Sequence, residues 1–317
     1  MGGDCQGGRA VALKTIDELL AEIGPRWHLD IRQNSQAVKD AYEPLLRVAP
    51  KGAVTVRREL PYGPHPRQHL DVFRPDGAAG APVVAFVHGG AFVRGDKRTS
   101  EEIYDNVLYW FARHGFVGLN IEYRMAPEAR HPMAAEDVRE ALAWAHRHAA
   151  EHGGDAARLL LIGHSAGGAH VASCVFGPGA ASGPTPASAV VLISARLRAD
   201  RSAANPNAAG VAAYYGPDES RDAVDPPIHH AAGSDLPVFV VLADYENPGL
   251  DVEGLEFAFR LALARGRAPR LLQARGHNHM SIVAHFNTGD EALGRAILDF
   301  FHSTPGEATR RAREAAT

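Results

Sequence analysis

The sequence Gly-His-Ser-Ala-Gly at residues 163–167 restricts the fold of this 317-residue chain more than any other feature. An apolar run, residues 159–162, precedes it, and a segment that can be helical, residues 168–174, follows it. A serine between glycines, with a strand before it and a helix after it, is typical of a strained turn that exposes the serine hydroxyl. Side chains at the two glycine positions would collide with the neighbouring strand and helix. Because glycine is abundant, at 32 residues, an ordinary strand–helix turn also fits, and the rest of the chain must decide.

Strand and helix patterns alternate along most of the chain. Residues 53–60 and 68–73 have the two-residue period of antiparallel strands, with the turn-rich residues 61–66 between them. Continuous apolar runs separated by helical patterns then indicate a parallel sheet that is covered on both faces. The expected parallel strands are 83–88, 117–123, 159–163, 189–194, 237–243 and 270–274, and the expected helices are 11–23, 35–46, 103–114, 134–148, 168–174, 252–265 and 291–301.

Two segments do not fit this alternation. Residues 1–50 contain two helical patterns ahead of the sheet, and residues 196–235 look irregular and are rich in Ala, Pro, Asp and Asn. Sites of open α/β sheets lie at the carboxyl ends of the strands, so we expect both segments to help cover such a site. We predict three segments. Residues 1–50 form an N-terminal helical segment that helps to cover the site, residues 51–303 form a catalytic domain, and residues 304–317 form a C-terminal tail.

A serine nucleophile needs a base, and the base needs an acid that orients it. We expect the acid after the next-to-last strand, where Asp244, Glu246 and Asp251 are candidates, and the histidine after the last strand, where His277 and His279 are candidates. Asp244 could instead cap the turn, and Asp251 lies where the N-cap of the next helix is expected. The residues alone leave both choices open.

The loop His-Gly-Gly-Ala-Phe at residues 88–92 follows the first expected parallel strand. Backbone N–H groups in such a loop, together with the N–H that follows the nucleophile, can bind the oxyanion of a tetrahedral intermediate. We therefore expect the oxyanion hole at Gly90, Ala91 and Ala166. His88 is expected to organise the loop through hydrogen bonds.

Charge and composition exclude several classes of protein. The net charge of −4 comes from well-mixed charges, which argues against nucleic acid or an anionic membrane as the main partner. Cys5 and Cys174 provide no disulfide framework, and no signal peptide or membrane-spanning run is recognisable, so we expect a soluble cytoplasmic protein. Two pairs of histidines, at residues 277/279 and 229/230, have no further ligands at the spacing of a zinc motif. No metal or cofactor is therefore expected.

Three segments of the chain resemble the hormone-sensitive-lipase-like branch of the α/β-hydrolases. They are residues 88–92, Glu-Tyr-Arg-Met-Ala-Pro-Glu at residues 122–128, and Gly-His-Ser-Ala-Gly-Gly at residues 163–168. Glu122 stands where the family usually has Asp, and Ala91 replaces the fourth glycine of the oxyanion loop, which leaves its backbone N–H in place.

Other residues are more similar to the arylformamidase, or kynurenine formamidase, relatives of that branch. His164 stands in place of the usual Asp before the serine, and Asp-Lys-Arg follows the oxyanion loop at residues 96–98. Residues 246–248 match the acid-x-Pro loop of these relatives, and residues 278–283 match their histidine-centred segment.

The resemblance covers residues 55–302 and implies an α/β-hydrolase fold with a triad of Ser165, Glu246 and His279. It implies hydrolysis of a small carboxylic ester through an acyl-enzyme, or of an aryl amide such as N-formylkynurenine. A non-catalytic ligand-binding protein of the same fold is a third hypothesis, which the presence of all three triad residues disfavours. The expected partner is a small-molecule substrate, and the oligomeric state is left open between a monomer and a homodimer.

Overall fold

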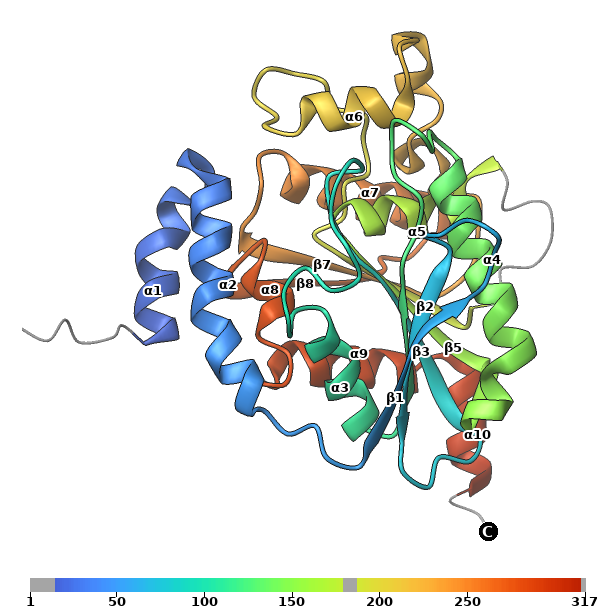
Figure 1. The fold of residues 1–317 in the computed structure, drawn as a ribbon. Coiled ribbons are helices and arrows are strands. Elements are labelled where there is room, and N and C mark those ends of the chain that lie inside the picture. Colours follow the sequence, from blue (N-terminus) through green and yellow to red (C-terminus); the bar gives the residue numbers. More distant parts are fainter. Residues whose placement is uncertain (1–14, 179–186, 315–317) are drawn as a thin grey trace, which may run out of the picture.

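The computed structural model describes residues 15–178 and 187–314, and within them it contains one sheet of eight strands (Figure 1). The strand order is β1-β2-β4-β3-β5-β6-β7-β8. The β1–β2 and β2–β4 pairs are antiparallel, and every later pair is parallel. The strands are β1 Val54–Pro61, β2 His69–Pro75, β3 Ala81–Val87, β4 Val117–Ile121, β5 Gly154–His164, β6 Ala189–Ile193, β7 Val238–Tyr245 and β8 Arg270–Asn278.

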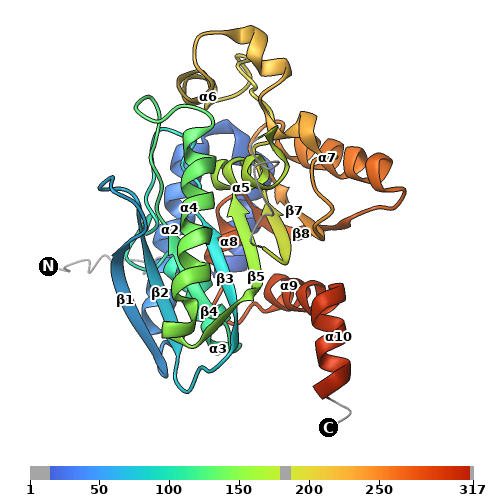
Figure 2. The ribbon, with the colours of Figure 1, turned by 90° about the vertical axis from the view of Figure 1, so that its right-hand side faces the viewer.

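Helices cover both faces of this sheet (Figure 2). The core on one face includes side chains of α4, α5 and α7, and the core on the other includes side chains of α1, α2, α3, α8 and α9. The helices are α1 Ile16–Ile23, α2 Ile31–Val48, α3 Asp105–Arg113, α4 Met133–His148, α5 Ala166–Phe176, α6 Ala208–Tyr215, α7 Leu250–Arg265, α8 Ser281–Ala284, α9 Ala292–His302 and α10 Pro305–Glu314. The described residues also form the 3₁₀ helices η1 Gly24–Leu29, η2 Ala149–His152, η4 Glu219–Ala223 and η5 Pro227–His230.

The predicted fold class is confirmed, and the central strands explain why. All five residues of β4 and all five of β6 are buried, as continuous apolar strands between two helical layers should be. The sheet contains both strand directions because the chain forms the antiparallel strands β1 and β2 before the parallel strands.

Two segments near the expected site differ from the sequence predictions. Residues 196–235 are not wholly irregular, because Ala208–Tyr215 forms α6. Its alanines favour a helix, but Pro206 and Gly216 on either side made the segment look like a loop. Strand β8 continues to Asn278, so His277 lies in the strand and not in the loop after it. Helix α1 ends at Ile23, as predicted, and the chain continues from Gly24 as the 3₁₀ helix η1.

The N-terminal helices lie beside the carboxyl ends of β7 and β8, and α6 lies above the sheet (Figure 1). A Cβ on Gly24 of η1 would come within 2.4 Å of the ring of Tyr245, so this turn and the end of β7 are in close contact. Residues 305–314 form α10, and Glu307 in it pairs with Arg158 at 2.5 Å. The division into segments at residues 50 and 303 stays a prediction.

In the described ranges, no helix combines the length and the apolar character that crossing a membrane requires. Cys174 is a buried free cysteine in α5, as expected from its apolar surroundings. Cys5 and the start of the first predicted helix lie outside the described residues.

Candidate active site

Ser165 occupies the strained turn between β5 and α5, with φ 56° and ψ −121°. A non-glycine residue adopts this conformation only when its surroundings enforce it. A Cβ on Gly163 would lie 2.7 Å from the carbonyl oxygen of Gly167, and a Cβ on Gly167 would lie 2.3 Å from the carbonyl oxygen of His88. Both glycines are therefore required where the sequence pattern placed them.

His279 connects the serine to a carboxylate. The hydroxyl of Ser165 donates to Nε2 of His279 at 3.0 Å, and Nδ1 of His279 donates to Oε2 of Glu246 at 2.8 Å. Because a carboxylate only accepts hydrogen bonds, this geometry assigns the proton of the neutral ring to Nδ1 and leaves Nε2 free to accept. The three predicted residues thus lie in one chain of hydrogen bonds.

Glu246 is held in place by its own strand. Its second carboxylate oxygen accepts the backbone N–H of Ala243 at 2.8 Å, and its side chain is only 3% exposed. A carboxylate bonded at both oxygens has little freedom to turn away from His279. The structure therefore brings this acid, of the three candidates, to the histidine.

The other two acids have local roles. Asp244 accepts the backbone N–H of Gly276 at 3.0 Å and so joins the ends of β7 and β8. Asp251 lies in the first turn of α7, where its carboxylate accepts the N–H of Val252 at 2.9 Å. The N-cap of α7 is Gly249, so the expected N-cap position of Asp251 was wrong.

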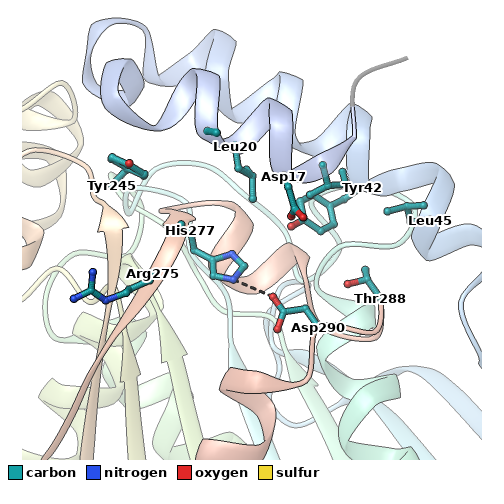
Figure 3. Close-up of a pocket in the computed structure, with 12 residues that line it drawn as sticks. Asp17, Leu20, Tyr42, Leu45, Tyr245, Arg275, His277, Thr288 and Asp290 are labelled. Atoms are coloured by element: carbon teal, nitrogen blue, oxygen red, sulfur yellow. Dashed lines mark hydrogen bonds and ion pairs between the residues drawn. The ribbon is translucent and has the colours of Figure 1, made fainter. Parts of the chain in front are cut away.

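His277 lies away from Ser165, in a separate pocket beside α1 and α2 (Figure 3). Its Nε2 is 3.2 Å from Oδ2 of Asp290, and its Nδ1 is 3.2 Å from Oγ of Ser281. The structure therefore separates the two candidate histidines, and only His279 contacts the elbow serine.

The oxyanion loop has an unusual backbone. Gly90 has φ +154°, and a Cβ there would lie 1.7 Å from the carbonyl oxygen of Arg94. Ala91 and Phe92 also have positive φ, at 50° and 70°. Among the described residues, the N–H groups of Gly90, Ala91 and Ala166 have no hydrogen-bond acceptor. These are the three donors that the sequence predicted, and they are free to bind an oxyanion.

Glu122 braces this loop from below. Its carboxylate pairs with Nε2 of His88 at 2.9 Å, accepts the backbone N–H of Lys97 at 2.9 Å and contacts Arg67. Burial raises the pKa of Glu122, but the charge and hydrogen bond of His88 and the charge of Arg67 outweigh burial and lower the pKa to about 2. The expected role of His88 as a loop-organising hydrogen-bond donor is confirmed by its contacts with Glu122 and with the carbonyl of Gly89.

His164 has a role that its sequence position did not reveal. Its Nε2 donates to the backbone carbonyl of His279 at 3.0 Å, and its Nδ1 accepts the hydroxyl of Tyr104 at 3.2 Å. Burial, with the nearby His279 adding to it, holds the pKa of His164 well below its usual range. A neutral histidine thus fixes the backbone of His279, and no signal local to residue 164 could have indicated a partner 115 residues away.

A pocket of about 720 Å³ opens above Ser165 and His279. The N-terminal segment and the oxyanion loop line it together, and three of its lining side chains are cationic: Arg32, Lys39 and Arg94. Within the described part of the chain, none of the three has a carboxylate within 4.0 Å. Burial lowers the pKa of Lys39, and the charge of Arg94 lowers it further.

Two aromatic side chains, Trp27 and Tyr214, differ in their relation to this pocket. Trp27 lines the pocket and donates from Nε1 to Oδ1 of Asn247 at 2.9 Å, directly beside the triad acid. Tyr214 is buried and stacks on Phe92 with ring centroids 4.5 Å apart, so it supports the oxyanion loop from behind. Helix α6 packs closely there, since a Cβ on Gly210 would lie 2.4 Å from the carbonyl oxygen of Ala91.

Sequence comparisons match part of this chain to esterases. The BD-FAE family model matches residues 70–218, just under half of the chain. The chain is 41% identical to Esterase LipC of Mycobacterium tuberculosis over 114 residues, which cover 35% of this chain and 28% of the relative. It is 36% identical to the probable isoprenylcysteine alpha-carbonyl methylesterase ICMEL1 of Arabidopsis thaliana over 122 residues, or 38% and 25% of the two chains. The chain thus spans about a quarter of the length of these relatives.

Solved structures resemble the chain over nearly its whole length. A bacterial heroin esterase superposes with a TM-score of 0.68 and 24% identity, covering 90% of this chain and 97% of that chain. A phosphonate-inhibited esterase B from Lactobacillus rhamnosis superposes with a TM-score of 0.73 and 19% identity, covering 93% and 98%. At these identities, the likeness shows the fold alone, and the chemistry must be argued from the residues of the site.

Proposed function

We propose that this chain, which has the α/β-hydrolase fold, hydrolyses a small carboxylic ester through an acyl-enzyme on Ser165. The observation that carries the proposal is the hydrogen-bonded chain from Ser165 through His279 to Glu246 at the floor of a pocket. The esterase names of the relatives support the same reaction class, and the family model matches the residues that include the oxyanion loop and the elbow.

The first half of the reaction forms the acyl-enzyme. Nε2 of His279 takes the proton of Ser165 as the oxygen attacks the ester carbonyl, and the carboxylate of Glu246 stabilises the imidazolium that results. The carbonyl oxygen becomes an oxyanion, which the N–H groups of Gly90, Ala91 and Ala166 bind. His279 then returns the proton to the leaving alkoxide, which departs as an alcohol.

The second half regenerates the enzyme. His279 takes a proton from a water molecule, and the hydroxide attacks the acyl carbonyl through a second tetrahedral intermediate at the same three N–H groups. The serine oxygen leaves and takes the proton back from His279. His164, whose ring is held by the hydroxyl of Tyr104, bonds to the backbone carbonyl of His279 throughout, so the imidazole stays aligned in both halves.

The same residues would also cleave an aryl amide, which is the alternative function. The observation that favours it is His164, because a histidine before the nucleophilic serine is the feature shared with arylformamidase relatives. An N-formylkynurenine-like substrate would be attacked at its formyl carbonyl, and His279 would protonate the leaving aniline nitrogen.

A comparison of kcat/KM for p-nitrophenyl acetate and N-formylkynurenine tests these two functions. We expect turnover of the ester that disappears in Ser165→Ala. Cleavage of the formyl amide orders of magnitude faster than the ester would replace the esterase proposal with the arylformamidase one. Absence of turnover on both, with no acyl or phosphonate adduct on Ser165, would favour the non-catalytic ligand-binding protein.

A further inference from the structure

A second pocket, of about 530 Å³, lies between the N-terminal helices and the segment that follows β8 (Figure 3). Leu20 of α1 and Tyr42 of α2 line one side, and His277, Thr288 and Asp290 line the other. The pocket is separate from the one that contains Ser165, since no residue lines both. The proposed ester hydrolysis gives it no role.

Three side chains have the chemistry of metal ligands here: His277 and Asp290 line this pocket, and His285 is buried next to them. His277 is the next-to-last residue of β8, His285 follows α8, and Asp290 precedes α9. One potential ligand atom from each lies within 4.8 Å of the other two. Two imidazoles and a carboxylate on three short consecutive elements therefore converge on one point.

Ser281 anchors the far side of both imidazole rings. Its Oγ lies 3.2 Å from Nδ1 of His277, and its backbone carbonyl accepts Nδ1–H of His285 at 3.0 Å. The two ring centroids are 4.5 Å apart with planes 36° from parallel. Histidine ligands are usually oriented in this way, with one ring nitrogen bonded to an oxygen and the other left for the metal.

An ordinary ion pair accounts for only part of this cluster. Nε2 of His277 and Oδ2 of Asp290 satisfy each other at 3.2 Å. His285 is fully buried, and its Nε2 has no hydrogen-bond partner in the described residues. A buried acceptor without a donor is rare in folded proteins and calls for a ligand. Because Nδ1 of this ring carries the proton, Nε2 presents a lone pair.

We propose that His277, His285 and Asp290 bind one divalent transition-metal ion of the Zn²⁺ class. Two imidazoles and a carboxylate suit Zn²⁺, Co²⁺ or Ni²⁺, whereas Mg²⁺ and Ca²⁺ prefer oxygen ligands. A tetrahedral ion at about 2.0–2.2 Å from each ligand places its ligand atoms roughly 3.3–3.6 Å apart. The His277–Asp290 pair already has nearly this separation, so binding requires mainly an approach of His285. Water would complete the coordination of the ion.

The bound ion would tie together the segment that carries the catalytic base, because the three ligands lie at residues 277, 285 and 290 and His279 lies between them. When the ion binds, the ring proton of His277 moves from Nε2 to Nδ1. Nε2 then binds the ion, and Nδ1 donates a hydrogen bond to Oγ of Ser281. The ion takes no part in acyl transfer. The spacing of the ligands, at intervals of eight and five residues, matches no short zinc motif, and for this reason the sequence pointed to no metal site.

Zinc titration of the full-length protein after dialysis against a chelator tests the proposal. Calorimetry and metal analysis are expected to show one Zn²⁺ per chain, with a rise in Tm. His285→Asn keeps a donor to the carbonyl of Ser281 but removes Nε2, and Asp290→Asn keeps the shape of the side chain but removes the charge. Each should weaken binding at least about 100-fold. His229→Asn, in a histidine pair outside the cluster, should leave binding unchanged.

Binding of Zn²⁺ at less than one per chain, or equal affinity in wild type, His285→Asn and Asp290→Asn, would overturn the proposal. A loss of affinity in His229→Asn as large as in His285→Asn would overturn it as well. Circular dichroism of each apo variant establishes that it is folded, and if His285→Asn does not fold, Asp290→Asn decides the matter. Ester turnover is not a readout, so the outcome is independent of the proposed function.

Discussion

The end of β8 presents two histidines, two residues apart, and each stands between a serine and a carboxylate. His279 joins Ser165 to Glu246, and His277 lies between Ser281 and Asp290. The two sets use opposite ring nitrogens, since Nε2 of His279 faces its serine whereas Nε2 of His277 faces its carboxylate. A serine, a histidine and an acid within hydrogen-bond distance are therefore insufficient to define a catalytic site.

The surroundings of Ser165 and Ser281 show how the two sets of residues differ. Ser165 has a strained backbone with φ 56°, lines a pocket and lies beside unoccupied backbone N–H groups. Ser281 begins a short helix, is completely buried, and its Oγ accepts the backbone N–H of Asn278 at 2.9 Å. A nucleophile must reach a carbonyl and have donors for the oxyanion, and only Ser165 meets both conditions.

The two serine variants should differ more than any other pair. Ser165→Ala is expected to lower kcat for p-nitrophenyl acetate by about 10⁴–10⁶, because acyl-enzyme formation is lost. Ser281→Ala should lower it by no more than about tenfold, through looser packing near His279. Steady-state kinetics on both variants measure the contrast, and similar losses would mean that the elbow is not the distinguishing feature.

The two acids on the β7 side give the next contrast. Glu246→Gln should cost about 10³–10⁴ in kcat, because the wrong imidazole tautomer is then favoured. Asp244→Asn removes a carboxylate that only joins two strand ends, so a loss of less than about tenfold is expected. If Asp244→Asn proves the more damaging variant, the assignment of the acid is wrong.

Much of this fold and part of this site could be predicted from the sequence. The elbow at residue 165 and the loop at residues 88–92 are recognisable because only glycine fits their backbones, and such requirements are visible in a sequence. The choice between His277 and His279 could not be made from the residues alone, because both lie at the end of the same strand and the sequence does not say which way each ring turns. Contacts between distant segments, such as Trp27 with Asn247 or His164 with His279, likewise leave no local pattern.

Glu122 supports the oxyanion loop beside Ser165, whereas no such loop lies beside Ser281 among the described residues. The folded-state pKa of Glu122 is lowered to about 2 by His88 and Arg67 against the effect of burial. The unfolded value is about 4.3, so the ionised side chain stabilises the fold above that pH, and the stabilisation is lost as the pH falls towards 2. In chemical denaturation, the gap in unfolding free energy between wild type and Glu122→Gln should be largest above about pH 5 and narrow below pH 4. A gap that does not change with pH would contradict the ion pair.

The charges of the two pockets give the smallest predicted effect. Lys39 lines the pocket of Ser165, whereas Asp17, Asp290 and Arg275 line the pocket of His277. Lys39→Gln should lower kcat/KM several-fold for an ester that carries a carboxylate and leave a neutral ester unaffected, with a smaller difference at high salt. Arg275→Gln removes a similar charge from the other pocket and should change neither substrate. Equal effects of Lys39→Gln on both esters would show that the charge does not select substrates.

The most direct test of the central claim is to label the protein with a fluorophosphonate and locate the adduct by mass spectrometry. A phosphonate reacts with a serine that has an activating histidine, an open pocket and oxyanion donors. We predict one adduct per chain on the peptide that contains Ser165, and none in Ser165→Ala. An adduct on Ser281, or no adduct on the wild-type protein, would contradict the account.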